Sequence, residues 1–98
     1  MAFTRHITLT PGTVQPWTFN DNSSAFEILN RNGAGEVYIS HDGTASPADP
    51  TVGGSGFDVV PAVTGAAVQM RRATGTQNAI TVKVISAAAT AVSIRSLA

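Results

Sequence analysis

Short runs of alternating apolar and polar residues, separated by turn-forming residues, most constrain how this chain can fold. Within one run, Ile80, Val82 and Val84 occupy every second position, which is the period of a β-strand with one buried face. About eight such runs occur at spacings of about ten residues, with glycine, proline and asparagine between them. The sequence therefore predicts an all-β fold, a single small antiparallel β-sandwich or barrel of about eight short strands, Ig-like or jelly-roll-like, with residues 1–98 forming one domain.

Residues 25–43 are expected to form the central hairpin of this domain. Two apolar runs flank Asn32-Gly33, a pair that tolerates the positive φ angles of tight reversing turns. The residues expected to point inward are Phe26, Ile28, Val37 and Ile39, and those expected to point outward are Glu27, Glu36 and Ser40.

Two residues mark the first two strands as sheet edges. Arg5 interrupts the apolar face of the first alternating run, which indicates that this strand begins at an edge. Pro16 lies within the second run and cannot donate a ladder hydrogen bond, so that strand belongs at an edge or carries a bulge.

The composition argues against a nucleic-acid or a membrane partner. Six basic and six acidic residues give a formal net charge of zero, without the basic stripe that nucleic-acid binding requires. No apolar run approaches the roughly 18 residues of a membrane span, and the N-terminal residues lack the apolar core of a signal peptide. The chain contains no cysteine. Since a small β domain without disulfides often gains stability by association, we expect a homo-oligomer. From the charge balance and the absence of a long apolar run, we expect neither a nucleic-acid nor a membrane partner.

The titratable residues follow no catalytic or metal-binding pattern. None of the carboxylates is framed by neighbours that would assign one as general acid and another as base. His41 and Asp42 adjoin a long loop that holds Asp49 and leads to Asp58, but the spacing matches no calcium-binding loop. Neither His6 nor His41 lies in a sequence pattern of further zinc ligands. We therefore expect no enzyme activity, no metal and no cofactor.

Two other motifs have simpler structural explanations. Residues 53–56, Gly-Gly-Ser-Gly, lack the Lys-Ser/Thr pair and the following helix of a phosphate-binding loop. Trp17 and Tyr38 could form a sugar-binding platform if they were exposed together, but with 6% aromatic residues they are expected in the core.

Several blocks of the sequence combine into a pattern. They are His6-Ile7-Thr8-Leu9-Thr10-Pro11-Gly12-Thr13-Val14 with Phe19, Ile28-Leu29-Asn30-Arg31-Asn32-Gly33, Tyr38-Ile39, Asp42-Gly43-Thr44, Val59-Val60-Pro61-Ala62 and Val82-Lys83-Val84-Ile85-Ser86. The pattern resembles small virion proteins encoded in the head gene clusters of tailed phages. The chain departs from it at Pro16-Trp17.

The resemblance implies a β-sandwich structural protein of a phage virion. Its expected role is capsid decoration, as a cement protein that binds the outside of the shell at capsomer junctions, stabilises it and has the major capsid protein as partner. The resemblance also implies assembly in the host bacterial cytoplasm and a final location on the capsid surface, with a trimer favoured. The alternatives are a head–tail connector or tail-associated virion protein and, from another class, a carbohydrate-binding module.

Two segments are expected to contact the partner. One is the N-terminal segment, and the other is the loop 44–56, whose prolines and glycines indicate an exposed surface loop. The contact residues predicted in them are Ala2, Phe3, Thr4, Arg5, Thr44, Ser46, Pro47, Asp49, Pro50, Val52 and Ser55.

Overall fold

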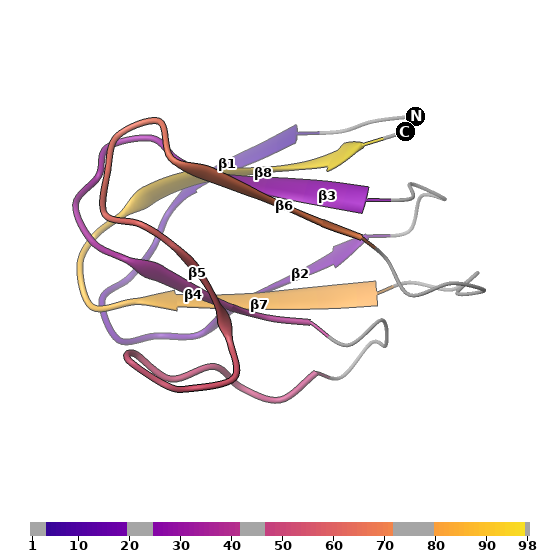
Figure 1. The fold of residues 1–98 in the computed structure, drawn as a ribbon, viewed down its shortest axis with the longest axis horizontal. Helices are drawn as coiled ribbons and strands as arrows, with labels where there is room; N and C mark the ends of the chain where they lie inside the picture. The colour runs from indigo at the N-terminus through magenta and orange to yellow at the C-terminus, as the bar shows by residue number, and fades with distance from the viewer. Residues whose placement is uncertain (1–3, 20–24, 42–46, 72–79, 98) are drawn as a thin grey trace.

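Eight β-strands form the regular structure in the computed structural model, which describes residues 4–19, 25–41, 47–71 and 80–97. The strands are β1 (Thr4–Thr8), β2 (Gln15–Phe19), β3 (Ala25–Asn30), β4 (Val37–Ser40), β5 (Asp58–Val60), β6 (Ala67–Arg71), β7 (Ile80–Ser86) and β8 (Ala91–Leu97). They make two four-stranded antiparallel sheets with the orders β1-β8-β3-β6 and β2-β7-β4-β5. The two sheets lie one above the other as a sandwich (Figure 1). The prediction of an all-β sandwich is confirmed.

The strand order is that of an eight-stranded jelly roll. Consecutive strands alternate between the two sheets, with the exception of β4 and β5, which pair directly with each other. Of the two topologies that the sequence left open, the jelly roll fits this order, whereas an Ig-like sandwich would require a different arrangement of strands.

The prediction that residues 25–43 form a hairpin is wrong. β3 and β4 lie in different sheets, and the segment 31–36 crosses from one sheet to the other. β3 instead pairs with β6 and β8, while β4 pairs with β5 and β7. Alternation specifies which side chains are buried and not which strand lies alongside, so the same pattern fits both a hairpin and a corner between sheets.

The apolar interior lies between the two sheets. Its buried side chains are Leu9, Trp17, Phe26, Ile28, Val37, Ile39, Val60, Val82, Val84, Val92 and Ile94. The four residues predicted to point inward from the stretch 25–43 are all among them. Trp17 is only 4% exposed, which removes it as a surface platform for sugars.

Both predicted edge strands are confirmed as edges. β1 is the first strand of its sheet and β2 is the first strand of the other. The side chain of Arg5 is exposed, as expected for a charged residue on the apolar side of an edge strand. Pro16 lies opposite Lys83 of β7, and β2 is paired on one side alone, where a proline is tolerated better than in a central strand.

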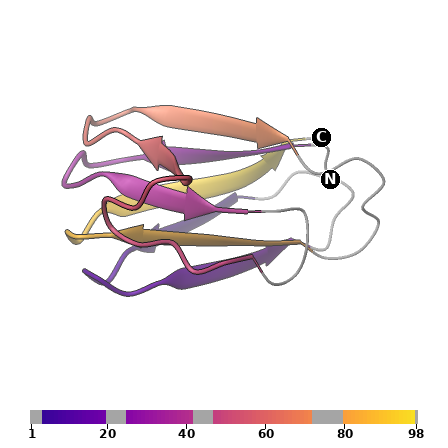
Figure 2. The ribbon, with the colours of Figure 1, turned by 60° about the horizontal axis from the view of Figure 1, so that its bottom comes forward.

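Residues 47–57 cross the outer face of the β2-β7-β4-β5 sheet (Figure 2). Lys83 of β7 donates a hydrogen bond from Nζ to Oδ1 of Asp49 at 2.8 Å. Pro47 and Pro50 are both buried. The described part of the predicted exposed loop is therefore partly packed onto the sheet, because its prolines bury apolar surface there.

This cover explains why Ser40, which was predicted to point into solvent, is buried. Ser40, Thr81 and Ile85 lie on the covered side of their strands and are 6%, 6% and 7% exposed. On the same face, Tyr38 donates a hydrogen bond from its hydroxyl to Oε1 of Glu36 at 3.1 Å. That carboxylate raises the pKa of the Tyr38 hydroxyl by stabilising its protonated form.

Four short connections meet at one end of the sandwich (Figure 1). They are the segments 9–14, 31–36, 61–66 and 87–90. Each crosses between sheets, so its backbone groups cannot all pair within a ladder and need other partners. Backbone bonds from the connections to neighbouring segments supply some of these partners, including the bond from Gly12 N to the carbonyl oxygen of Ser86, the last residue of β7, at 2.8 Å.

The buried amide of Asn30 supplies three more partners at this end. Its Nδ2 donates to the carbonyl oxygens of Gly35 at 3.0 Å and Pro61 at 2.9 Å, and its Oδ1 accepts from Gly33 N at 2.8 Å. Gly33 has a φ of 66° and its Cα lies close to Thr64, which leaves no room for a side chain. Asn30 thus holds the β3–β4 corner against the β5–β6 corner.

Replacing Asn30 with alanine should destabilise the fold strongly. The change leaves two carbonyl oxygens and one N–H without their partner in a partly buried site, and a fully buried group of this kind costs about 1–3 kcal/mol. We expect Asn30→Ala to lower the free energy of unfolding by about 2–4 kcal/mol. Urea denaturation, followed by circular dichroism, measures this quantity.

Asn32→Ala is the matched control for this prediction. Asn32 also bonds to backbone, accepting from Ala34 N and Ala91 N at 3.1 Å, but it is exposed and water can replace the lost bonds. Its loss should cost less than about 1 kcal/mol. Equal losses in the two variants would contradict the structural role assigned to Asn30.

Candidate functional site

The outer face of the β1-β8-β3-β6 sheet gathers the polar side chains that form the candidate site. Strand register places Thr4, Arg95, Glu27 and Gln69 in one row across all four strands. The segment 47–57 covers the other sheet instead. Within residues 4–19, 25–41, 47–71 and 80–97, the sandwich therefore has one covered and one open outer face.

A second row contains a histidine. His6, Ser93 and Leu29 lie opposite one another on β1, β8 and β3. The His6 ring is within hydrogen-bond distance of Ser93, with 2.6 Å between Nδ1 and Oγ. The next outward residue after Leu29 is Arg31, whose N–H donates to the carbonyl oxygen of Ala91 on β8 at 2.8 Å.

Glu27 is fully engaged by its neighbours. Its Oε1 accepts from Nε of Arg95 at 2.8 Å, and its Oε2 accepts from Nε2 of Gln69 at 2.9 Å. The side chain of Glu27 is only 13% exposed. The bond from Gln69, helped by the bond and the charge of Arg95, holds the pKa of the Glu27 carboxyl below its ordinary value, against the opposing effect of desolvation.

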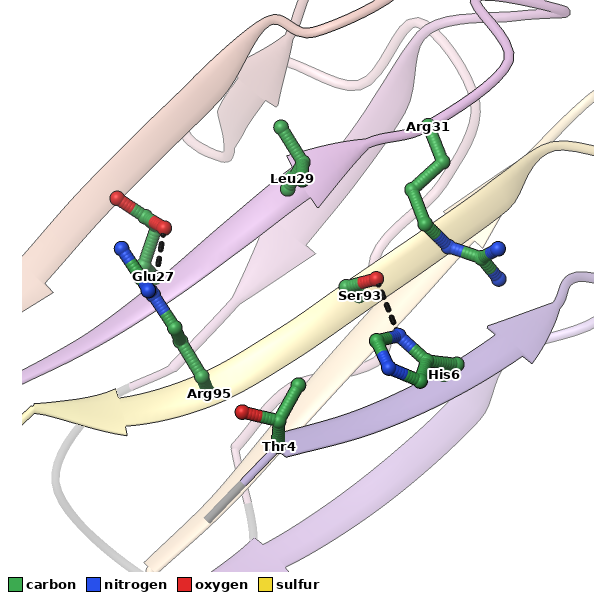
Figure 3. Close-up of a pocket in the computed structure, with 7 residues that line it drawn as sticks. All are labelled: Thr4, His6, Glu27, Leu29, Arg31, Ser93 and Arg95. Carbon is green, nitrogen blue, oxygen red and sulfur yellow. Dashed lines mark hydrogen bonds and ion pairs between the residues drawn. The ribbon is translucent and has the colours of Figure 1, made fainter. Parts of the chain in front are cut away.

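A groove of about 320 Å³ runs over these rows. Its lining residues are Thr4, His6, Glu27, Leu29, Arg31, Ser93 and Arg95 (Figure 3). In the close-up, the Glu27–Arg95 pair lies at one end, while Arg31 and the His6–Ser93 pair lie at the other. The groove is open to solvent, and Leu29 contributes an apolar surface between its polar ends.

The groove lacks the arrangement of a hydrolase. A serine nucleophile needs a histidine base that a third group orients. Ser93 and His6 are in contact, but the carboxylate of Glu27 bonds to Arg95 and Gln69. Ser93 is also only 6% exposed. The groups that line the groove offer hydrogen bonds and charge to a ligand.

The sequence had identified only part of this face. The outward positions of the first strand, Thr4 and His6, follow from alternation. Leu29, Ser93 and Arg95 could not be added, because their approach depends on β8 lying between β1 and β3. Pairing of segments so distant in the chain leaves no local signal.

The predicted contact residues are spread over different parts of the molecule. Among the described residues, Thr4 lines the groove, Arg5 is exposed on the other side of β1, and Val52 and Ser55 are exposed in the segment across the opposite sheet. Ala2, Phe3, Thr44 and Ser46 lie outside the described residues. As described above, Pro47 and Pro50 are buried, and Asp49 is paired with a lysine.

Of the residues considered for a metal site, the structure places His41 next to Asp58. Nε2 of His41 lies 3.2 Å from Oδ2 of Asp58, and the His41 ring packs edge-on against Phe26. Asp42 lies outside the described residues. Across residues 4–19, 25–41, 47–71 and 80–97, no three metal-binding side chains form a cluster.

Those same four segments contain no helix that could cross a membrane.

Comparison with known proteins places the chain by its fold. No protein-family model matches it, and no curated protein matches its sequence. A de novo designed double-stranded β-helix is similar in structure, with a TM-score of 0.51 and 13% identity over 97% of this chain and 94% of that one. The Yersinia pseudotuberculosis-derived mitogen has a TM-score of 0.52 and 10% identity, over 100% of this chain and 86% of that one.

A viral domain is more distant. The P-domain of Penaeus vannamei nodavirus has a TM-score of 0.46 and 11% identity, over 100% of this chain and 96% of the domain, which is too low a similarity to carry a conclusion. At these identities the similarities define a small β-sandwich and no particular activity.

The Glu27 pairing predicts how stability depends on pH. Because the folded state lowers the pKa of Glu27, its stabilising effect is complete above the pKa of the unfolded chain and is lost as the pH falls through the folded value. We expect a carboxyl titration by NMR to give a Glu27 pKa below 4.5, and Gln69→Ala to raise it. Between neutral and acid pH, Glu27→Gln should lose less stability than the wild type. Parallel stability curves for the two proteins would contradict the pairing.

Proposed function

We propose that this protein is a structural protein of a tailed-phage virion, a capsid decoration protein that binds the outside of the shell and acts by adhesion. It is not an enzyme, and its partner is the major capsid protein. The observation that carries the proposal is the open outer face of the β1-β8-β3-β6 sheet, with polar side chains around Leu29. The jelly-roll order, which recurs in viral capsid and lectin domains, and the resemblance of the sequence blocks support the same role.

Three of the four edge strands favour docking by a face over docking by strand addition. The edge strand β1 carries the charged residue Arg5, and the edge strand β2 carries Pro16. The edge strand β5 has only three residues. Charges, prolines and short length are the features by which proteins block pairing with another strand. A partner is therefore bound more readily across the open face than along these edges.

A symmetric shell makes weak contacts sufficient. Each copy meets the same capsid surface at an equivalent position, and association into a homo-oligomer, for which a trimer is favoured, multiplies the contacts of one subunit. The open face needs only modest affinity for each copy, in keeping with a groove of about 320 Å³.

Cryo-electron microscopy of particles tests the role directly. We expect the protein in many copies over the outer shell, at the junctions between capsomers. Density confined to a ring of about a dozen copies or fewer at the portal would instead assign the protein to the head–tail joint. Absence from the particle would reject a virion role.

A pair of substitutions tests which surface binds. Leu29→Glu introduces a charge into the middle of the open face, and we expect shell occupancy to fall at least about tenfold, since the partner would have to cover a charged side chain in place of an apolar one. Val52→Glu makes the same chemical change at a side chain 47% exposed on the opposite side. Occupancy should then change less than about twofold.

Both variants must first give the folded-state circular dichroism spectrum. Loss of binding in Val52→Glu alone would assign the contact to the segment 47–57 instead of the open face.

A further inference from the structure

We infer that the Arg31 end of the groove binds a carboxylate side chain, Asp or Glu, on the surface of the partner protein. The inference rests on the proposed function and specifies the chemistry of its contact. Arg31 follows β3 directly, and Figure 3 shows its guanidinium at the same end of the groove as His6 and Ser93.

Within the described part of the chain, the guanidinium of Arg31 is largely unused. Among the described residues its one side-chain bond runs from Nη2 to the carbonyl oxygen of Val92, at a long 3.4 Å. Arginine has five N–H donors in a planar fork, so most of them remain for a ligand. A fork of this kind matches a carboxylate with two parallel hydrogen bonds.

Glu27, the carboxylate that lines the groove, does not neutralise Arg31. Glu27 lies four positions earlier on β3, about 13 Å away at the rise of a strand, and is occupied by Arg95 and Gln69. A charge at that distance is mostly screened at physiological salt. With two arginines and one glutamate, the groove lining has a net charge of +1 when His6 is neutral.

The neighbours of Arg31 complete a site for an acidic side chain. His6 uses Nδ1 toward Ser93, and its Nε2 has no partner among the described residues, so it is available as a second contact. Leu29 offers an apolar surface to the methylene groups that precede the carboxylate. This combination favours an acidic side chain on a protein over a free inorganic anion, which would leave the apolar contact empty.

An NMR titration of the whole chain tests the site, with a capped tetraglutamate peptide as the probe. We expect saturable amide shifts at Arg31, Ser93 and His6, and none of this pattern with a capped tetraglutamine peptide. Arg31→Gln should weaken binding at least about fivefold, as expected for loss of charge-assisted hydrogen bonds. The wild-type affinity should also fall as salt is added.

Arg5→Gln is the matched control. It removes the same charge from an exposed residue outside the groove lining, so binding should change less than about twofold. Equal weakening in the two variants, shifts scattered over the surface, or a DNA oligonucleotide that binds through Arg31 while tetraglutamate does not would each overturn the inference. Matching amide spectra of the free variants establish that both are folded.

Shell occupancy separates this inference from the proposed function. Wild-type protein on the shell with a several-fold lower occupancy for Arg31→Gln supports both. Equal occupancy of wild type and Arg31→Gln overturns the carboxylate contact and leaves the decoration role intact. If the wild type is absent from the particle, the decoration role fails, and the peptide titration alone decides whether the groove binds carboxylates.

Discussion

The crossing of the chain between two sheets is the constraint on which the rest of this structure depends. Packed sheets lie about 10 Å apart, and almost every connection must span that gap within a few residues. Backbone groups at such corners lose their ladder partners and are too close to the core to rely on water alone. The side-chain amide of Asn30 meets this need, because one buried group serves three backbone positions from two corners. The stacking of the two sheets therefore depends on hydrogen bonds to the backbone of the connections between them.

The two outer faces of the sandwich differ because the segment 47–57 covers only one of them. On one side, residues 47–57 bury Pro47 and Pro50 and pair Asp49 with Lys83. On the other side, the groove remains open in the part of the chain that the structure describes, and there one of its arginines pairs with Glu27 while Arg31 makes a single long side-chain bond. A surface on which one charge is paired and the next is available is suited to recognition, since the paired charge holds the geometry and the available one meets the ligand.

Much of the fold was predictable because alternating apolar residues along a strand indicate which side chains are buried. Phe26, Ile28, Val37 and Ile39 were assigned to the interior by that rule, and Arg5 and Pro16 located the edges because a charge or a missing N–H has a local cost. Neighbouring strands were not predictable in the same way. Asn32-Gly33 is a reversing turn by its chemistry, yet here the turn passes the chain to the other sheet.

The candidate site was the least predictable part, for the same reason. His6, Leu29 and Ser93 are adjacent only because β8 lies between β1 and β3. No property of any one of these segments specifies that arrangement. Arg31, taken alone in the sequence, is indistinguishable from an ordinary solvated arginine.

The central position of β8 also governs when this protein can exist as a folded unit. β1 and β3 have no contact as strand neighbours until Ala91–Leu97 is inserted between them, so a ribosome must release nearly every residue described here before that sheet can close. Pairing over such sequence separations slows folding because a long loop must be closed first. Nascent chains would therefore be the stage most exposed to aggregation and proteolysis.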